Sequence, residues 1–138
     1  MSNTAYTEEE FNNQLNDGIV ILDFFATWCG PCKELSPILD KIEEKYSNIK
    51  IMKINIENNN LITETFDIRS LPTLIFYYKG EIFHRETGFS KEGYNIAKYV
   101  STLLIKDKYD NTESKDNLII EKEIEDTTKE IFKYIRSS

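Results

Sequence analysis

Two apolar runs, separated by a segment of helical periodicity, constrain the fold of this chain more than any other feature. The runs are IVILDFFA at 19–26 and IKIMKINI at 49–56. Apolar, β-branched runs of this length are typical of strands buried on both faces, as in a parallel sheet. Each run carries a charged residue near its centre, Asp23 in the first and Lys53 in the second. These charges need an explanation, because an unpaired charge is costly to bury.

The segment between the two runs has the spacing of an amphipathic helix. Pro31 suits the first turn of a helix, where its missing N–H group costs little. Pro37 lies inside the pattern and predicts a kink. The apolar positions that recur at helical spacing are Cys32, Leu35, Ile38, Leu39, Ile42 and Tyr46.

The other segments up to residue 105 continue the alternation of helices and strands. This order predicts an α/β fold with a central mixed sheet of four to five strands flanked by helices. Capping and turn signals place the remaining elements. They are a helix capped by Thr7 and Glu10, a helical turn at 61–66, a hairpin of strands 73–78 and 81–86 around a Lys-Gly turn, and a helix from Ser90 to about Leu104.

The end of the chain differs from the rest. Residues 106–117 are polar and are expected to form a linker after a domain spanning 1–105. Residues 118–138 predict an amphipathic helix, either packed on its own domain or on a neighbour. Association with another chain and disorder until binding are the competing readings. The apolar stripe consists of Ile120, Ile124, Thr127, Ile131 and Ile135.

Composition argues against several classes of partner. The 138 residues carry a formal net charge of −7, whereas nucleic-acid binding needs a basic face. Apolar runs fall short of the roughly 20 residues needed to span a membrane, and we find no signal-peptide pattern. We therefore expect a soluble, cytoplasmic protein with neither nucleic acid nor membrane as a partner. The cytoplasm keeps thiols reduced, which disfavours a purely structural disulfide.

The two cysteines of the chain both lie in the sequence WCGPCK at 28–33. Cys29 falls where the first strand gives way to a helix, so the helix dipole and unpaired N–H groups favour its thiolate. Cys32, one turn later, is positioned to attack a mixed disulfide on Cys29. A structural crosslink would close too small a loop to stabilise the chain much. A metal site lacks ligands, since His84 is the one histidine, unless two subunits share it. A redox pair is the favoured reading.

The sequence WCGPCK resembles the active-site signature of the thioredoxin family, and the resemblance extends over residues 4–105. It implies the thioredoxin fold, with a C-terminal extension that the family lacks. It also implies a reversible Cys29–Cys32 disulfide and no bound cofactor. Further matches in order and spacing are Asp23 six residues before Cys29, Pro37 inside the helix, Lys53 on the next strand, the sequence LPT at 71–73, and Gly88.

The resemblance implies roles for the buried charges and for one proline. Asp23 should have a raised pKa and accept the proton of Cys32, while Lys53 moderates that shift. A simple buried ion pair is the alternative for these two charges. The peptide bond before Pro72 is implied to be cis, which leaves the backbone of Leu71 free to pair with an extended substrate.

A substrate surface around the cysteines is also implied. An apolar collar of Trp28, Leu71 and Phe89 would contact a protein substrate. The chain departs from the family at Leu71, where a β-branched residue is usual, and at Ser70, where glycine is common. The implied active-site loop is Trp28, Gly30 and Pro31, and the implied substrate-binding residues are Trp28, Leu71, Pro72, Gly88 and Phe89.

The implied activity is that of a protein-disulfide reductase. Such a protein donates electrons in cell redox homeostasis and is itself reduced by thioredoxin reductase. The Gly-Pro pair between the cysteines indicates the reducing end of the family. A thiol oxidase or isomerase is the alternative, as is a redox-active binding module whose tail docks a partner. We expect a monomer, with association through the tail as the competing state.

Overall fold

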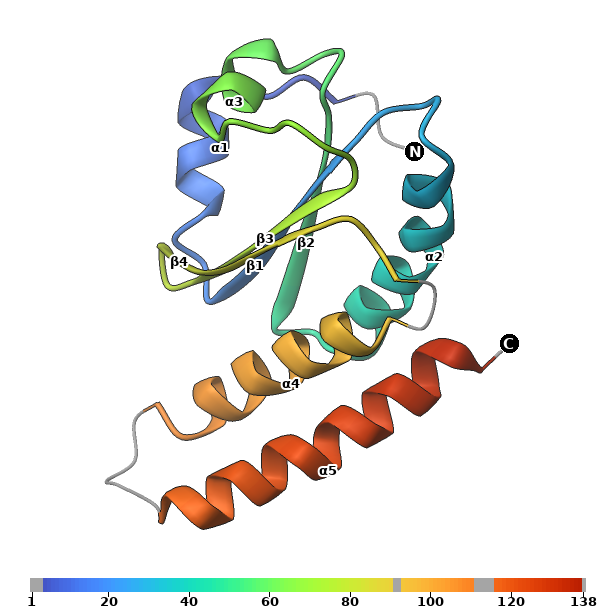
Figure 1. Cartoon of the computed structure of the whole chain (residues 1–138). Helices are drawn as coiled ribbons and strands as arrows, with labels where there is room; N and C mark the ends of the chain where they lie inside the picture. The colour runs from blue at the N-terminus through green and yellow to red at the C-terminus, as the bar shows by residue number, and fades with distance from the viewer. Residues whose placement is uncertain (1–3, 91–92, 111–115, 138) are drawn as a thin grey trace. The chain divides into compact units, whose positions relative to one another are not determined.

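The computed structural model describes residues 4–90, 93–110 and 116–137, and the chain divides into two compact units, residues 1–89 and 90–138. The first unit alternates helices and strands in the predicted order (Figure 1). Its elements are α1 (Glu8–Gln14), β1 (Ile19–Phe25), α2 (Gly30–Lys45), β2 (Ile49–Asn55), α3 (Asn60–Thr65), β3 (Thr73–Tyr78) and β4 (Glu81–Thr87).

The strands of the first unit form a four-stranded mixed sheet in the order β2-β1-β3-β4. β1 runs parallel to β2 and antiparallel to β3, and β3 runs antiparallel to β4. All seven residues of β1 are buried, which explains its continuous apolar run. Lys79 and Gly80 join β3 to β4 with positive φ angles of 49° and 84°, the backbone of a tight hairpin turn. The predicted mixed sheet and hairpin are confirmed.

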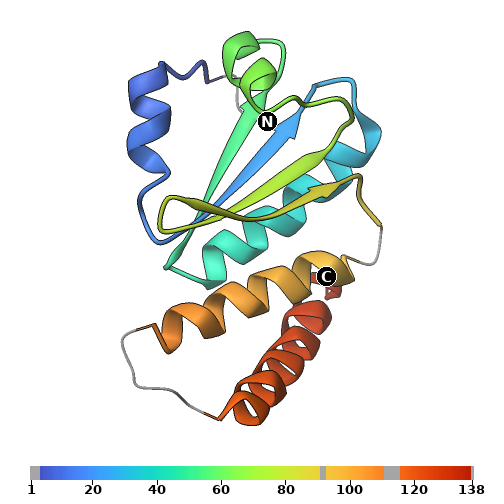
Figure 2. The ribbon, with the colours of Figure 1, turned by 60° about the vertical axis from the view of Figure 1, so that its left-hand side comes forward.

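Helices cover both faces of this sheet (Figure 2). α1 and α3 lie over one face, and the predicted capping box of Thr7 and Glu10 opens α1. α2 lies over the other face and contains Pro37; the kink at this proline stays a prediction. The core beneath α1 and α3 is formed by Phe11, Leu15, Val20, Leu22, Phe24, Met52, Ile54, Ile62, Ile75 and Tyr77.

The second unit is an antiparallel pair of helices, α4 (Tyr94–Lys108) and α5 (Asn117–Arg136). The Tyr94 and Phe132 rings meet edge-on with centroids 5.4 Å apart, and the Ser101 hydroxyl donates to the Ile124 carbonyl at 2.8 Å. The predicted C-terminal helix is confirmed, and it folds back on the helix before it. Its apolar stripe is buried or half-buried, with Ile131 and Ile135 the most deeply buried members.

The start of α4 corrects one expectation. Ser90 does not cap this helix; the N-cap is Gly93, whose φ of 73° lies in the left-handed region. A helix cannot continue through that conformation, so α4 begins at Tyr94. The helix also continues to Lys108, into the predicted linker 106–117. Residues 111–115 of that linker lie outside the described residues, and the domain boundary after residue 105 stays a prediction.

Candidate functional site

Cys29 and Cys32 lie at the junction of β1 and α2 and form a disulfide. Cys29 is the N-cap of α2, and its Sγ accepts a hydrogen bond from the Cys32 N–H group at 3.2 Å. Pro31 occupies the first turn, where a proline suits a helix start. A sulfur in this position receives the partial positive charge of the helix N-terminus, which stabilises a thiolate. The predicted strand-to-helix junction is confirmed.

The two cysteines differ in their access to solvent. Cys29 is 5% exposed, Cys32 is fully buried, and the neighbouring Trp28 is 69% exposed. An incoming molecule therefore meets the sulfur of Cys29 first.

A hollow of about 460 Å³ lies beside Cys29. It brings the predicted residues Trp28 and Leu71 together, although they are distant in sequence. Sequence analysis missed Ile56, Ile68 and Arg69 on its wall. The end of the second apolar run was a signal for Ile56, whereas Ile68 and Arg69 follow no periodic pattern. The hollow is lined by Trp28, Cys29, Gly30, Pro31, Ile56, Ile68, Arg69, Ser70 and Leu71.

Pro72 lies next to this hollow and is buried. The Leu71–Pro72 peptide bond is cis, as the resemblance implies. The Gly88 N–H group donates to the Pro72 carbonyl at 2.8 Å, which ties the loop after β4 to the start of β3. In the described part of the chain, Gly88 and the half-buried Phe89 do not line the hollow.

Asp23 lies near the middle of β1 on the face that α2 covers, and it is 2% exposed. Its Oδ1 atom has no hydrogen-bond partner among the described residues. Burial raises the pKa of this carboxyl to about 7; Lys53 lowers the pKa and Asp40 raises it. The expected raised pKa is therefore confirmed, and so is the moderating effect of Lys53.

Lys53 is the β2 residue directly opposite Asp23 in the sheet. Its ammonium group nevertheless pairs with the Asp40 carboxylate at 2.6 Å and donates to the Ser36 hydroxyl at 2.7 Å. The simple ion pair between Asp23 and Lys53 was thus a wrong alternative. Ser36 and Asp40 were missed, although their spacing of four residues on α2 places them on one side of that helix.

Two other features, a metal-binding cluster and a membrane-spanning helix, are absent from residues 4–90, 93–110 and 116–137. These residues contain no group of three or more His, Cys, Asp or Glu side chains that could hold a metal ion. None of their helices is long and apolar enough to span a bilayer. His84 pairs with Glu86 on the same strand, with Nε2 and Oε1 2.8 Å apart.

Comparison with known proteins gives consistent matches to the first three quarters of the chain. A model of the family described as thioredoxin matches residues 2–102. A thioredoxin of Chlamydia caviae is 41% identical over 80 residues, which cover 58% of this chain and 78% of that protein. A thioredoxin of Bacillus subtilis is 33% identical over 84 residues, covering 60% and 81%.

Solved structures agree with the sequence matches. The thioredoxin of Plasmodium falciparum superimposes with a TM-score of 0.60 at 29% identity, covering 64% of this chain and 88% of that one. The thioredoxin of Trypanosoma brucei brucei gives a TM-score of 0.57 at 30% identity, covering 61% and 75%. The family match ends before α5, so it gives no information on that helix.

Proposed function

The chain belongs to the thioredoxin family and is a thiol–disulfide reductase, and on this premise we propose a division of labour between its two cysteines. The Cys29 thiolate attacks a substrate disulfide, forms a mixed disulfide and releases one substrate thiol. Cys32 then attacks the Cys29 sulfur, closes the intramolecular disulfide and releases the second thiol. Two electrons and two protons pass to the substrate. The observation that supports this order is the small exposure of Cys29, 5%, beside Cys32, which has none.

Asp23 is the proposed acceptor of the Cys32 proton. Cys32 must lose its proton before it attacks, because the thiolate is the nucleophile. A carboxyl whose pKa is about 7 is protonated and deprotonated in comparable amounts at neutral pH, which suits a general base. We propose that the positive charge of Lys53, which is held in place by Asp40 and Ser36, lowers this pKa toward neutral.

The proposed substrates are disulfides in proteins. An extended substrate segment would lie in the hollow beside Cys29 and pair with the backbone of Leu71, opposite Trp28. Pro72 has no N–H group to compete for that pairing and shapes the loop. Gly88 supports this loop through its hydrogen bond to Pro72, and Phe89 extends the apolar surface.

We further propose a cytoplasmic cycle in which thioredoxin reductase restores the dithiol. The protein would then carry electrons to oxidised proteins and contribute to cell redox homeostasis. A monomer is the proposed active species, because the cysteines, Asp23 and the hollow all come from residues 1–89 of one chain.

Insulin reduction tests this proposal. The intact chain, supplied with dithiothreitol or with a thioredoxin reductase and NADPH, should precipitate reduced insulin catalytically. Cys29→Ser should abolish this turnover. Trp28→Ala, which leaves both sulfurs in place, should retain turnover with a raised KM if the hollow binds substrate. The function proposed here is refuted if the intact chain gives no turnover with either reductant.

A further inference from the structure

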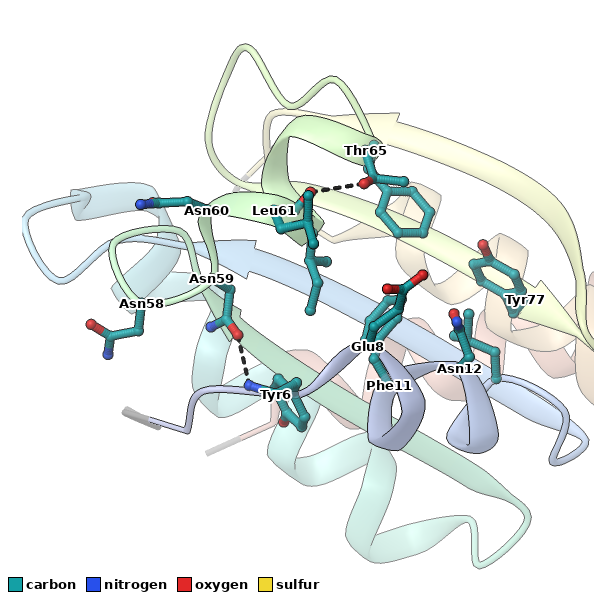
Figure 3. A pocket seen from close by; sticks show the side chains of 13 residues that line it. Tyr6, Glu8, Phe11, Asn12, Asn58, Asn59, Asn60, Leu61, Thr65 and Tyr77 are labelled. Atoms are coloured by element: carbon teal, nitrogen blue, oxygen red, sulfur yellow. Dashed lines mark hydrogen bonds between the residues drawn. The ribbon is translucent and has the colours of Figure 1, made fainter.

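A second and larger cavity lies on the opposite face of the sheet from α2. It has a volume of about 610 Å³ and opens between α1, α3 and β3 (Figure 3). No described residue belongs to both this cavity and the hollow beside Cys29. The proposed reduction cycle therefore leaves it without a role, although its volume suits a small molecule.

Four aromatic rings form a continuous wall along this cavity. The rings of Tyr6 and Phe11 are 6.4 Å apart between centroids, Phe11 and Phe66 are 5.8 Å apart, and Phe66 and Tyr77 are 6.4 Å apart. Each pair meets edge-on, so the chain of rings spans the space between α1 and β3. A flat aromatic ligand can stack or meet these rings edge to face, and each such contact adds to the gain from apolar burial.

A polar group that is free to bind a ligand also faces the cavity. Tyr77 is 7% exposed, and its hydroxyl makes no hydrogen bond to a described residue but is not among the buried polar atoms that lack a partner, so it is accessible from the cavity. An accessible phenol hydroxyl can donate a hydrogen bond to a polar atom of a ligand or accept one from it. By contrast, the buried Asn59 is already used: it accepts from the Tyr6 N–H group and donates to the Asn55 and Thr4 carbonyls.

The charge of the cavity is set by α1. Glu8 is the one charged residue among the described residues that line it, and it forms no ion pair with any of them. Glu9 and Glu10 in the same first turn add to the negative potential. Figure 3 shows Glu8 and Asn12, one helical turn apart, on the side of the cavity next to Tyr77. A cationic ligand group is therefore preferred to an anionic one.

We propose that this cavity binds a small, flat aromatic molecule that carries a cationic nitrogen. The ring lies against Phe11, Phe66 and Tyr77, and the nitrogen faces the Glu8 carboxylate. The Tyr77 hydroxyl bonds to a polar atom of the ligand. Because the cavity shares no residue with the hollow beside Cys29, this site does not depend on the redox state of the cysteines.

A titration of the full-length protein, followed by ¹H–¹⁵N correlation spectra, tests this site with benzamidine as the cationic probe. Benzamidine should give saturable shifts in the amide signals of α1, α3 and β3. Benzyl alcohol, a neutral probe of similar size, should bind the same residues more weakly, and benzoate should bind more weakly still. Glu8→Gln should weaken benzamidine binding about fivefold, as expected for one partly solvated ion pair, and leave benzyl alcohol binding unchanged. Tyr77→Phe should weaken both.

The matched control is Glu9→Gln, which removes the same charge from a neighbouring residue outside the cavity lining. It should leave benzamidine binding within about twofold of the unmodified protein. The site is refuted if the shifts do not saturate, if they map to other elements, or if Glu8→Gln and Glu9→Gln bind benzamidine equally. Insulin reduction should be unchanged in Glu8→Gln. A failure to bind benzamidine and a failure to reduce insulin are therefore separate results, the first against this site and the second against the proposed reductase cycle.

Discussion

Replacing the buried carboxyl of Asp23 by an amide should stabilise the oxidised protein, and the gain should increase with pH. In the folded protein, burial raises the pKa of Asp23 to about 7 from an ordinary value of 3.8. Between these two values the folded state keeps a proton that the unfolded state has released. The free energy of unfolding therefore falls as pH rises from about 4 to about 7, and then levels off. The Asp23→Asn variant lacks this titration and escapes the loss.

The size of the effect follows from the two pKa values. A difference of about 3 units corresponds to about 4 kcal/mol at pH 8, where the loss is complete, at about 1.4 kcal/mol per unit. At pH 5 the loss is only about 1.5 kcal/mol, because pH 5 lies just over one unit above the ordinary pKa of 3.8 that the carboxyl has in the unfolded chain. The stability advantage of Asp23→Asn should thus grow by about 2–3 kcal/mol between pH 5 and pH 8.

Urea unfolding of the oxidised proteins at pH 5, 6, 7 and 8 measures this difference. Other titrating groups are common to both proteins and cancel, and a change in packing from the amide adds a constant offset. The control is Asp126→Asn, an exposed carboxylate paired with Lys122, which should stay within about 0.5 kcal/mol of the unmodified protein at every pH. A stability difference for Asp23→Asn that does not change with pH would refute the reasoning, because Asp23 would then ionise normally in the folded protein.

Three further predictions concern the resolving thiol, the pKa of Asp23 and the C-terminal helix. Cys32→Ser should trap the mixed disulfide with a substrate protein, visible as a covalent adduct by mass spectrometry; rapid release of substrate without reductant would contradict the assigned order of attack. Asp40→Asn should lower the pKa of Asp23, since it removes a nearby negative charge and frees Lys53 from its ion pair. The pH profile of insulin reduction by Asp40→Asn should then move to lower pH. Asp40→Glu keeps the negative charge, so its profile should match that of the unmodified protein. Identical profiles for the two variants would exclude an effect of Asp40 on the pKa of Asp23. Ile131→Ala should cost about 2–5 kcal/mol and lower the hydrogen-exchange protection of α5, because this side chain is fully buried; unchanged protection would mean that the buried stripe does not hold the helix.

Features governed by short-range patterns could be predicted from the sequence. Apart from Asp23, the run at 19–26 is apolar at every position and rich in β-branched and aromatic residues, which is typical of a strand buried on both sides, and the structure has β1 there. The position of Cys29 followed from the same run, because the strand must end before Pro31 can start a helix. The capping box of α1 and the tight turn of the hairpin likewise depend on a few adjacent residues.

Features that depend on packing between distant segments could not be predicted. Helical spacing shows which residues of α2 face the sheet, but not that Ser36 and Asp40 reach Lys53. The rotation of the helix about its own axis decides this, and core packing sets that rotation. Ser90 has the right chemistry for an N-cap, yet the left-handed backbone of Gly93 fixes the start of α4. The aromatic cavity draws on three separated segments, so no local pattern reveals it.

The reduction potential of the cysteine pair tests the central assignment, a protein-disulfide reductase, most directly. The full-length protein is equilibrated with mixtures of reduced and oxidised glutathione, and the fraction of dithiol is read by thiol alkylation and mass spectrometry. We predict a potential more negative than about −230 mV, the lower limit typical of glutaredoxins, so that the dithiol gives its electrons to substrates. A potential at or above that value would contradict the assignment and indicate a thiol oxidase or isomerase.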